Sequence, residues 1–147
     1  MKTFVVLLAC FACAMSGCSD VTVSSYDNYR ELAASGAMDR GWVPEFIPAS
    51  AHDITEGHSV EISALSVGFS FGADFRPGKN SDFVLLRGDK REAVMDDVEF
   101  PHWAKITRSE SLEVFSICAD SQSGVLFMDS AASRGFYAQP AGEAKCD

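Results

Sequence analysis

The sequence predicts an α+β fold, with an N-terminal helix packed on an antiparallel β-sheet (a meander) in a single small domain. Three observations lead to this prediction. Residues 26–38 carry a helical pattern, residues 60–71 alternate as a strand does, and three strand-like runs close the chain. With 147 residues, 47% of them hydrophobic, the chain has the composition of one globular domain with its own core.

The first expected element is the helix. Ser24 and Asp27 have the spacing of a capping box, and Gly36 is placed as a stop signal. Helical spacing would put four residues on one face of it: Tyr26, Tyr29, Ala33 and Ala37.

A rigid extended corner is expected next, in the stretch RGWVPEFIPAS of residues 40–50. Pro44 and Pro48 fix their own φ angles and bias the preceding residues away from helix. The corner should direct its apolar side chains, Trp42 among them, toward the core.

Strands and one more helix follow. In residues 60–71 the apolar residues form two alternating sets that would point to opposite faces of one strand, and a bulge near Ala64 would bring both sets to the same face. Residues 89–98 predict a brief helix capped by Asp89 and Glu92. One face of the first strand should carry Leu65, Val67, Phe69 and Phe71. The closing strands are expected at residues 112–120, 124–130 and 135–139.

The N-terminus predicts export. Lys2 precedes twelve uncharged residues, 4–15. As a helix these would span about 18 Å, short of the roughly 30 Å hydrocarbon core, so they are typical of a signal peptide. The stretch MSGC that ends at Cys18 resembles the bacterial lipobox, whose cysteine is acylated. The alternative is an ordinary cleavage after Ala14, because ACA also has the A-x-A form.

Three segments follow from the lipobox. We expect residues 1–17 to be a lipoprotein signal peptide, residues 18–25 to be the acylated Cys18 with a short tether, and residues 26–147 to be the envelope domain. Stable anchoring needs more than one acyl chain, and bacterial lipoproteins of this type carry two or three, palmitate being one such chain. By the same resemblance, Ser19 after the cysteine favours the outer over the inner membrane of a Gram-negative cell, with the domain facing the periplasm.

The cysteines divide in the same way. Cys10 and Cys13 form a C-x-x-C within the segment expected to be removed, so this motif is not a redox or zinc site. Cys118 and Cys146 remain in an oxidising compartment and predict a disulfide that stabilises the fold by roughly 3–4 kcal/mol. The alternative is a buried Cys118 and a free Cys146.

The charge limits the partners. Removal of residues 1–17 takes away Lys2 and no acidic residue, so the net charge of −9 becomes −10. Such a surface repels phosphate backbones, which argues against nucleic acid as a partner. A basic envelope protein remains a plausible partner besides the lipid bilayer, and the alternative is that the acidity only aids solubility.

Residues 25–71 carry a pattern with specific spacing, from RGW-x-P to P-x-S-A. Its residues are Tyr26, Gly36, Ala37, Arg40, Gly41, Trp42, Pro44, Pro48, Ser50, Ala51, Ile54 and His58, followed by Phe69 and Phe71. This pattern resembles small bacterial lipoproteins that share a YbbD head domain, and residues 124–138 look like the closing strands of that group. The resemblance implies a fold and export, and it implies no reaction.

Two residue groups are candidates for chemistry. Arg40 and Trp42 could form a cation–π contact or a peptide-binding shelf, the alternative being a core tryptophan closed by the arginine stem. His52 and His58, with Glu56 between them, would share one face of a strand. A third metal ligand is missing, so we expect no metal site.

We find no catalytic constellation in the sequence. There is no G-x-S-x-G, and RPGKNS lacks the spacing of a phosphate-binding loop. We therefore expect a membrane-anchored envelope lipoprotein that binds a protein or serves a structural role, is not an enzyme and needs no cofactor. The alternative is a periplasmic inhibitor or immunity-type protein directed against a cationic envelope enzyme. The candidate motif in either case is Arg40, Trp42, Pro44, Pro48 and His58.

Overall fold

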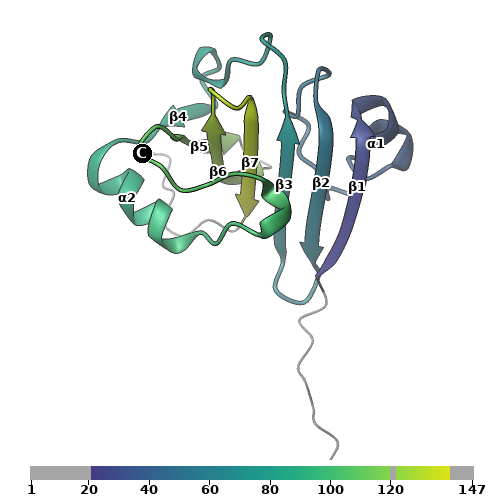
Figure 1. Ribbon diagram of the computed structural model, residues 1–147. Helices are drawn as coiled ribbons and strands as arrows, with labels where there is room; N and C mark the ends of the chain where they lie inside the picture. Colours follow the sequence, from purple (N-terminus) through teal and green to yellow (C-terminus); the bar gives the residue numbers. More distant parts are fainter. Residues whose placement is uncertain (1–20, 120–121, 140–147) are drawn as a thin grey trace, which may run out of the picture.

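The computed structural model describes residues 21–119 and 122–139 of the chain (Figure 1). Within these residues, seven strands form one antiparallel sheet in the order β1-β2-β3-β7-β6-β5-β4. The first three strands are β1 (Thr22–Asn28), β2 (His52–Ser59) and β3 (Ala64–Ser70). The other four are β4 (Phe83–Leu85), β5 (Glu113–Ala119), β6 (Gln122–Asp129) and β7 (Arg134–Gln139). Two α-helices are α1 (Tyr29–Ser35) and α2 (Gly88–Asp97), and two 3₁₀ turns are η1 (Pro77–Lys79) and η2 (His102–Ala104).

The predicted α+β class is wrong, because the fold is mainly β. Residues 22–28, expected as tether and helix start, pair with β2 along their length, so Tyr26 lies in a strand. The helix that follows has seven residues, of which only Leu32 is buried. A helix this short gains little by itself, whereas a strand beside β2 gains a full ladder of backbone hydrogen bonds. The expected tether therefore cannot extend past Val21.

The start of α1 also differs from the prediction. Its N-cap is Asn28, whose side chain accepts a hydrogen bond from the backbone N–H of Glu31 at 3.1 Å. The Glu31 carboxylate in turn accepts from the backbone N–H of Asp27 at 2.8 Å. The predicted stop is confirmed: Gly36 has a φ of +73°, the left-handed conformation that glycine adopts most readily.

The later elements match their predicted positions. The three closing strands are β5, β6 and β7, and the helix expected at residues 89–98 is α2. Asp89 and Glu92 do not cap α2, because Arg87 is its N-cap and makes no side-chain capping bond. Residues 60–63 form the turn between β2 and β3 in place of the expected bulge, and the bulge lies in β2 between His52 and Thr55.

Both faces of the sheet are covered. Side chains that alternate along β5, β6 and β7 enter one core or the other, which is why these strands read as nearly continuous apolar runs. The segment of residues 29–51 covers the first core, whose buried members from the sheet are Ile54, Val67, Phe69, Phe83, Phe115, Ile117, Leu126, Met128 and Tyr137. Helix α2 and residues 98–112 cover the second, in front of the sheet in Figure 1. Leu65, Val67, Phe69 and Phe71 share the first core, as predicted.

The sheet has two distinct ends. At one end, the first residues of β1 lie beside the β2–β3 turn, because Thr22 pairs with His58. We call this the hairpin end; it is the lower end in Figure 1. At the other end, β3 leads into residues 71–79, close to the β6–β7 turn at residues 130–133, and we call this the loop end.

Candidate functional site

The structure brings Arg40, Trp42 and His58 together and adds Glu56 to them; we call these four residues the corner cluster. The Trp42 ring stacks on the His58 ring with 4.1 Å between centroids and 17° between planes. The Arg40 Cζ atom lies 4.1 Å from the Trp42 ring centroid, within the range of a cation–π contact. His58 Nδ1 lies 2.9 Å from Glu56 Oε2.

Three members of the corner cluster are turned inward, and the exposed Arg40 lies over the Trp42 ring. Glu56 is fully buried, the His58 side chain is 11% exposed, and Trp42 packs partly buried against the first core. Arg40 also donates to the Ser35 carbonyl at 3.1 Å. The two interpretations of Arg40 and Trp42 are thus combined: the cation–π contact exists, and it closes the core over a buried carboxylate.

The two prolines of the motif shape the segment above this cluster. The buried Pro44 and the half-buried Pro48 offer their carbonyls to the backbone N–H groups of Ile47, at 3.3 Å, and Ala51, at 2.9 Å. These are successive turns, so the corner is not extended as predicted. It does carry its apolar side chains inward, and Phe46 contacts the rings of Phe83 and Tyr137 edge-on.

His52 lies apart from the corner cluster. It is exposed at the start of β2, six residues from His58, which corresponds to about 20 Å along a strand. Among the described residues, no group of three or more His, Cys, Asp or Glu side chains is placed to hold a metal ion.

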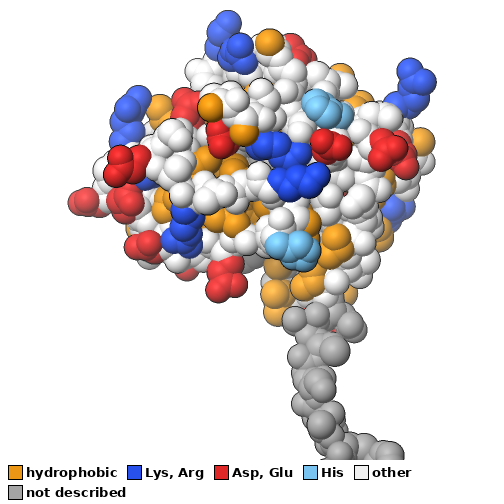
Figure 2. All heavy atoms as spheres, viewed as in Figure 1, with side chains coloured by type: hydrophobic (Ala, Val, Ile, Leu, Met, Phe, Trp, Pro, Cys, Tyr) orange, Lys and Arg blue, Asp and Glu red, His pale blue; other side chains and the backbone are white. Residues whose placement is uncertain are grey.

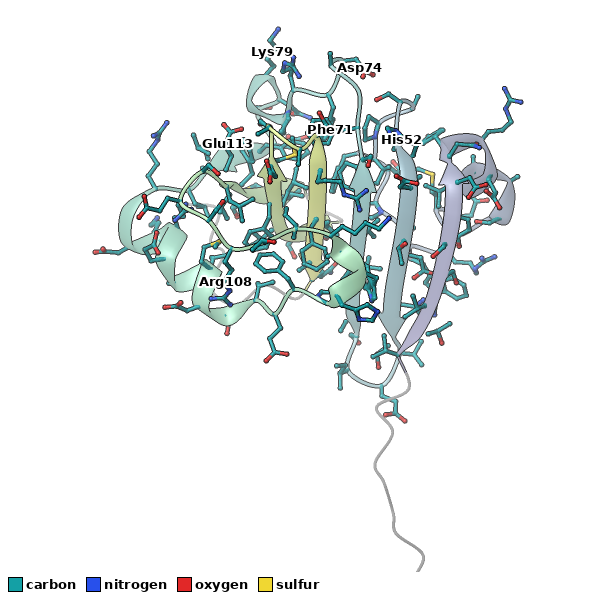
Figure 3. The ribbon with its side chains drawn as sticks, in the orientation of Figure 1. His52, Phe71, Asp74, Lys79, Arg108 and Glu113 are labelled. Atoms are coloured by element: carbon teal, nitrogen blue, oxygen red, sulfur yellow. The ribbon has the colours of Figure 1, made fainter. Side chains whose placement is uncertain are left out.

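A pocket of about 490 Å³ opens at the loop end. Residues 71–79, the start of β5 and the β6–β7 turn line it, and Phe71, Lys79 and Glu113 are labelled there in Figure 3. Its apolar lining is Phe71, Phe75, Phe115 and Met128, and its polar lining includes Arg76, Lys79, Glu113, Ser130 and Ser133. We call this the loop-end pocket.

Local packing holds the loop-end pocket open. The rings of Phe71 and Phe75 meet edge-on at 5.4 Å, and Phe75 also contacts Phe69 at 5.8 Å. Where β5 meets the β6–β7 turn, Ser130 Oγ donates to Glu113 Oε2 at 2.9 Å. An apolar lining beside both basic and acidic side chains suits an apolar side chain flanked by charge. The sequence analysis did not single out this pocket, although Phe71, Phe75, Arg76 and Lys79 place aromatic and basic side chains close together in the chain.

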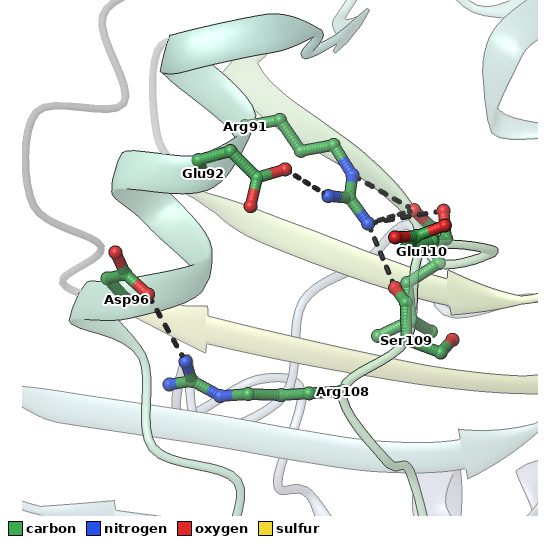
Figure 4. A network of polar contacts seen from close by, with 7 residues as sticks. Arg91, Glu92, Asp96, Arg108, Ser109 and Glu110 are labelled. Atoms are coloured by element: carbon green, nitrogen blue, oxygen red, sulfur yellow. Dashed lines mark hydrogen bonds and ion pairs between the residues drawn. The ribbon is translucent and has the colours of Figure 1, made fainter.

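Two arginines fix the segment that covers the second core (Figure 4). Arg91 contacts Glu92 and donates to the Ser109 carbonyl at 2.9 Å, and it also donates to the carbonyls of Glu110 and Leu112. Arg108 donates to the Val98 carbonyl at 2.8 Å and lies 3.5 Å from Asp96. The two guanidinium groups donate mainly to backbone carbonyls, so this network holds residues 98–112 against α2.

The cysteines are only partly covered by the structure. Cys118, in β5, is disulfide-bonded. All other cysteines, the predicted partner Cys146 and the predicted lipidation site Cys18 included, lie outside the described residues. The bridge to Cys146 and the acylation of Cys18 therefore stay predictions.

The family model of the YbbD head domain matches residues 20–70. The match begins just before β1, ends with β3 and contains the whole corner cluster, so this part of the chain is a YbbD-head-type domain. It suggests an envelope-associated protein and names no activity. Neither the curated proteins nor the solved structures contain a match to this chain. None of the helices in the described residues is long and apolar enough to span a membrane.

Proposed function

We propose that this protein is a lipid-anchored bacterial envelope lipoprotein that binds a partner protein and catalyses no reaction. The premise is the YbbD-head-type domain at residues 20–70. Cys18 is its acylated residue and residues 1–17 are its signal peptide. The domain faces the periplasm, from the outer rather than the inner membrane.

The position of the loop-end pocket carries the proposal. Cys18 precedes Val21 by three residues, so the acylated residue lies within about 11 Å of the hairpin end. The eight residues of β2 then correspond to about 26 Å of strand between the hairpin end and the loop end. An anchor at Cys18 therefore holds the loop-end pocket on the side of the domain that faces away from the membrane, where a periplasmic partner can reach it.

The lining of the pocket defines the kind of partner. Two basic side chains, Arg76 and Lys79, and one acidic side chain, Glu113, surround its apolar floor. A protein segment with one large apolar side chain beside an acidic residue satisfies both features. The corner cluster has a separate role in this proposal, because its side chains are engaged with one another and hold residues 36–51 on the core.

Site-specific cross-linking in living cells tests the proposal. A photo-reactive residue at Lys79 should give a discrete adduct with an envelope protein, and the same residue at the exposed Lys90 of α2 should not give it. Arg76→Glu should weaken the adduct, whereas the matched Arg87→Glu should not, since both arginines are exposed and only Arg76 lines the pocket. Equal adducts from both positions, or none from Lys79, contradict the proposed site.

The absence of catalysis needs its own test. The purified protein should show no hydrolase turnover above a blank, and His58→Ala and substitutions of the carboxylates should leave that baseline unchanged. A turnover that His58→Ala or a carboxylate substitution abolishes contradicts the proposal.

A second candidate is an inhibitor or immunity-type protein against a cationic envelope enzyme. It is favoured by the acidic surface of α2, where Figure 2 shows red side chains gathered at the left of the molecule. The exposed acidic residues of this helix are Asp89, Glu92, Asp96 and Asp97. A cross-link from Lys90 to a basic hydrolase, with none from Lys79, would favour this candidate.

A further inference from the structure

The hairpin end carries an unusual set of exposed apolar side chains. Five large hydrophobic residues are exposed among the described residues, and four of them lie at this end. Val21 and Val23, at the start of β1, are each 49% exposed, while Val60 and Ile62, in the β2–β3 turn, are 80% and 64% exposed. We call these four residues the apolar rim. Figure 2 shows hydrophobic side chains gathered at this lower end of the molecule.

The fold gives no reason for the apolar rim. A four-residue turn between strands is normally built from polar residues and glycine, yet this turn exposes Val60 and Ile62 to solvent. Trp103 adds to the same end of the sheet. Its ring and the Val21 side chain both lie over Gly57, where an added Cβ would be 3.1 Å from Trp103 and 3.6 Å from Val21. A half-buried tryptophan beside exposed aliphatic residues is typical of a surface that meets the lipid–water interface.

We propose that the apolar rim inserts into the interfacial region of the membrane that anchors the protein. This inference rests on the proposed function, because an acylated Cys18 brings the rim to the lipid. Val21 follows Cys18 by three positions, a span of at most about 11 Å, so an anchored domain cannot move its hairpin end far from the bilayer. Four exposed apolar side chains held at that distance bury apolar surface when they enter the interface.

The charges near the apolar rim indicate whether the contact depends on the charge of the lipid headgroups. Residues 21–26 and 57–66 contain no Lys or Arg, and Glu61 lies between Val60 and Ile62. These segments therefore offer anionic headgroups no basic side chain. The rim should insert into vesicles of zwitterionic lipid at least as well as into vesicles that also contain anionic lipid.

The test uses the full mature protein, extracted with its acyl chains and reconstituted into vesicles of phosphatidylethanolamine and phosphatidylcholine. Ile62→Cys introduces a thiol for an environment-sensitive fluorophore, and Val84→Cys on the edge strand β4 is the matched control, an apolar residue 43% exposed away from the rim. The label at position 62 should shift to the blue. Spin-labelled lipid should quench it roughly threefold or more relative to position 84, because only position 62 enters the interface. The unsubstituted protein, treated with the same dye, gives the background.

The outcomes separate this inference from the proposed function. A protein that carries acyl chains and floats with the vesicles, but leaves position 62 no more quenched than position 84, overturns the insertion alone. A blue shift at position 62 that depends on protein concentration and not on lipid also overturns it, and assigns the rim to a second copy of the chain. A protein that has no acyl chain and does not float with the vesicles overturns both the anchor and the insertion.

Discussion

At the scale of single residues, Glu56 and His58 form a pair in which a buried carboxylate is held by one histidine. Glu56 is fully buried, and one of its carboxylate oxygens lies 2.9 Å from His58 Nδ1. The other oxygen, Oε1, has no hydrogen-bond partner among the described residues. A buried carboxylate in this setting relies on its single partner, so the two side chains should respond to substitution as a unit.

The first prediction concerns this pair. His58→Ala should lower the free energy of unfolding by about 3–5 kcal/mol, because it leaves the Glu56 carboxylate buried and unpaired. The double variant Glu56→Leu/His58→Ala should lose less, since no buried charge remains. Urea denaturation measures both, with the exposed His52→Ala as control, expected within about 0.5 kcal/mol of the unsubstituted protein. An equal cost for His58→Ala and His52→Ala would show that the pair does not matter.

The second prediction concerns Tyr137, which is fully buried in the first core with its hydroxyl 2.9 Å from Gln139 Oε1. Burial raises the pKa of Tyr137 to about 12, above the ordinary tyrosine value of 10.0 that applies in the unfolded chain. Above pH 10 the unfolded chain therefore releases this proton while the folded chain retains it, so stability should fall as pH rises toward 12. In Tyr137→Phe this part of the decline disappears. The midpoint of denaturant unfolding, measured between pH 9 and 11.5 in both proteins, tests this prediction. An equal fall of the midpoint with pH in both proteins would contradict it.

At the scale of secondary-structure elements, the sheet depends on close contacts between an aromatic ring and a facing glycine. Phe69 in β3 lies opposite Gly135 in β7. A Cβ added at Gly135 would come within 2.6 Å of the Phe69 ring. This contact lies where the two halves of the sheet join.

The third prediction follows from that contact. Gly135→Ala should lower the melting temperature and cost about 1–3 kcal/mol of unfolding free energy, because the Phe69 ring must leave its position. Gly78→Ala is the matched control, since an added Cβ there has its nearest neighbour at 3.9 Å, an ordinary contact. Equal melting temperatures for the two variants would mean that the sheet accommodates the methyl group.

The elements also show which sequence patterns were informative. The strands β5, β6 and β7 were predictable because their apolar runs are short, dense and bounded by loop residues. The strand β1 was not, because Tyr26 and Tyr29 have helical spacing and Ser24 resembles a cap. Pairing with β2, which lies more than twenty residues away, outweighed that local pattern.

At the scale of the whole molecule, the candidate sites differ in how much of each could be predicted from the sequence. Arg40, Trp42 and His58 could be singled out because they belong to one motif. Their buried partner Glu56 was noted only for its place between His52 and His58. The loop-end pocket could not be predicted. Its walls come from residues 71–79, β5 and the β6–β7 turn, which become neighbours only because β3 pairs with β7 and not with β4.

The fourth prediction concerns the link between β5 and the C-terminal tail. Cys118 is disulfide-bonded, and a bridge to Cys146 closes a loop that contains β6 and β7. Cys146→Ser should therefore lower the free energy of unfolding by roughly 3–4 kcal/mol, and added reductant should then have no further effect. An unchanged stability in this variant, or a further loss on reduction, contradicts the pairing.

The central claim is that the chain is anchored by lipid at the hairpin end and presents its pocket at the loop end. The intact mass of the protein extracted from bacterial membranes tests the anchor most directly. We predict a chain that begins at Cys18 and carries two or three acyl chains, and whose mass increases on reduction by the two hydrogens of one disulfide. A chain that begins at Met15 with an unmodified Cys18 would contradict the claim, because nothing would then hold the hairpin end at the membrane.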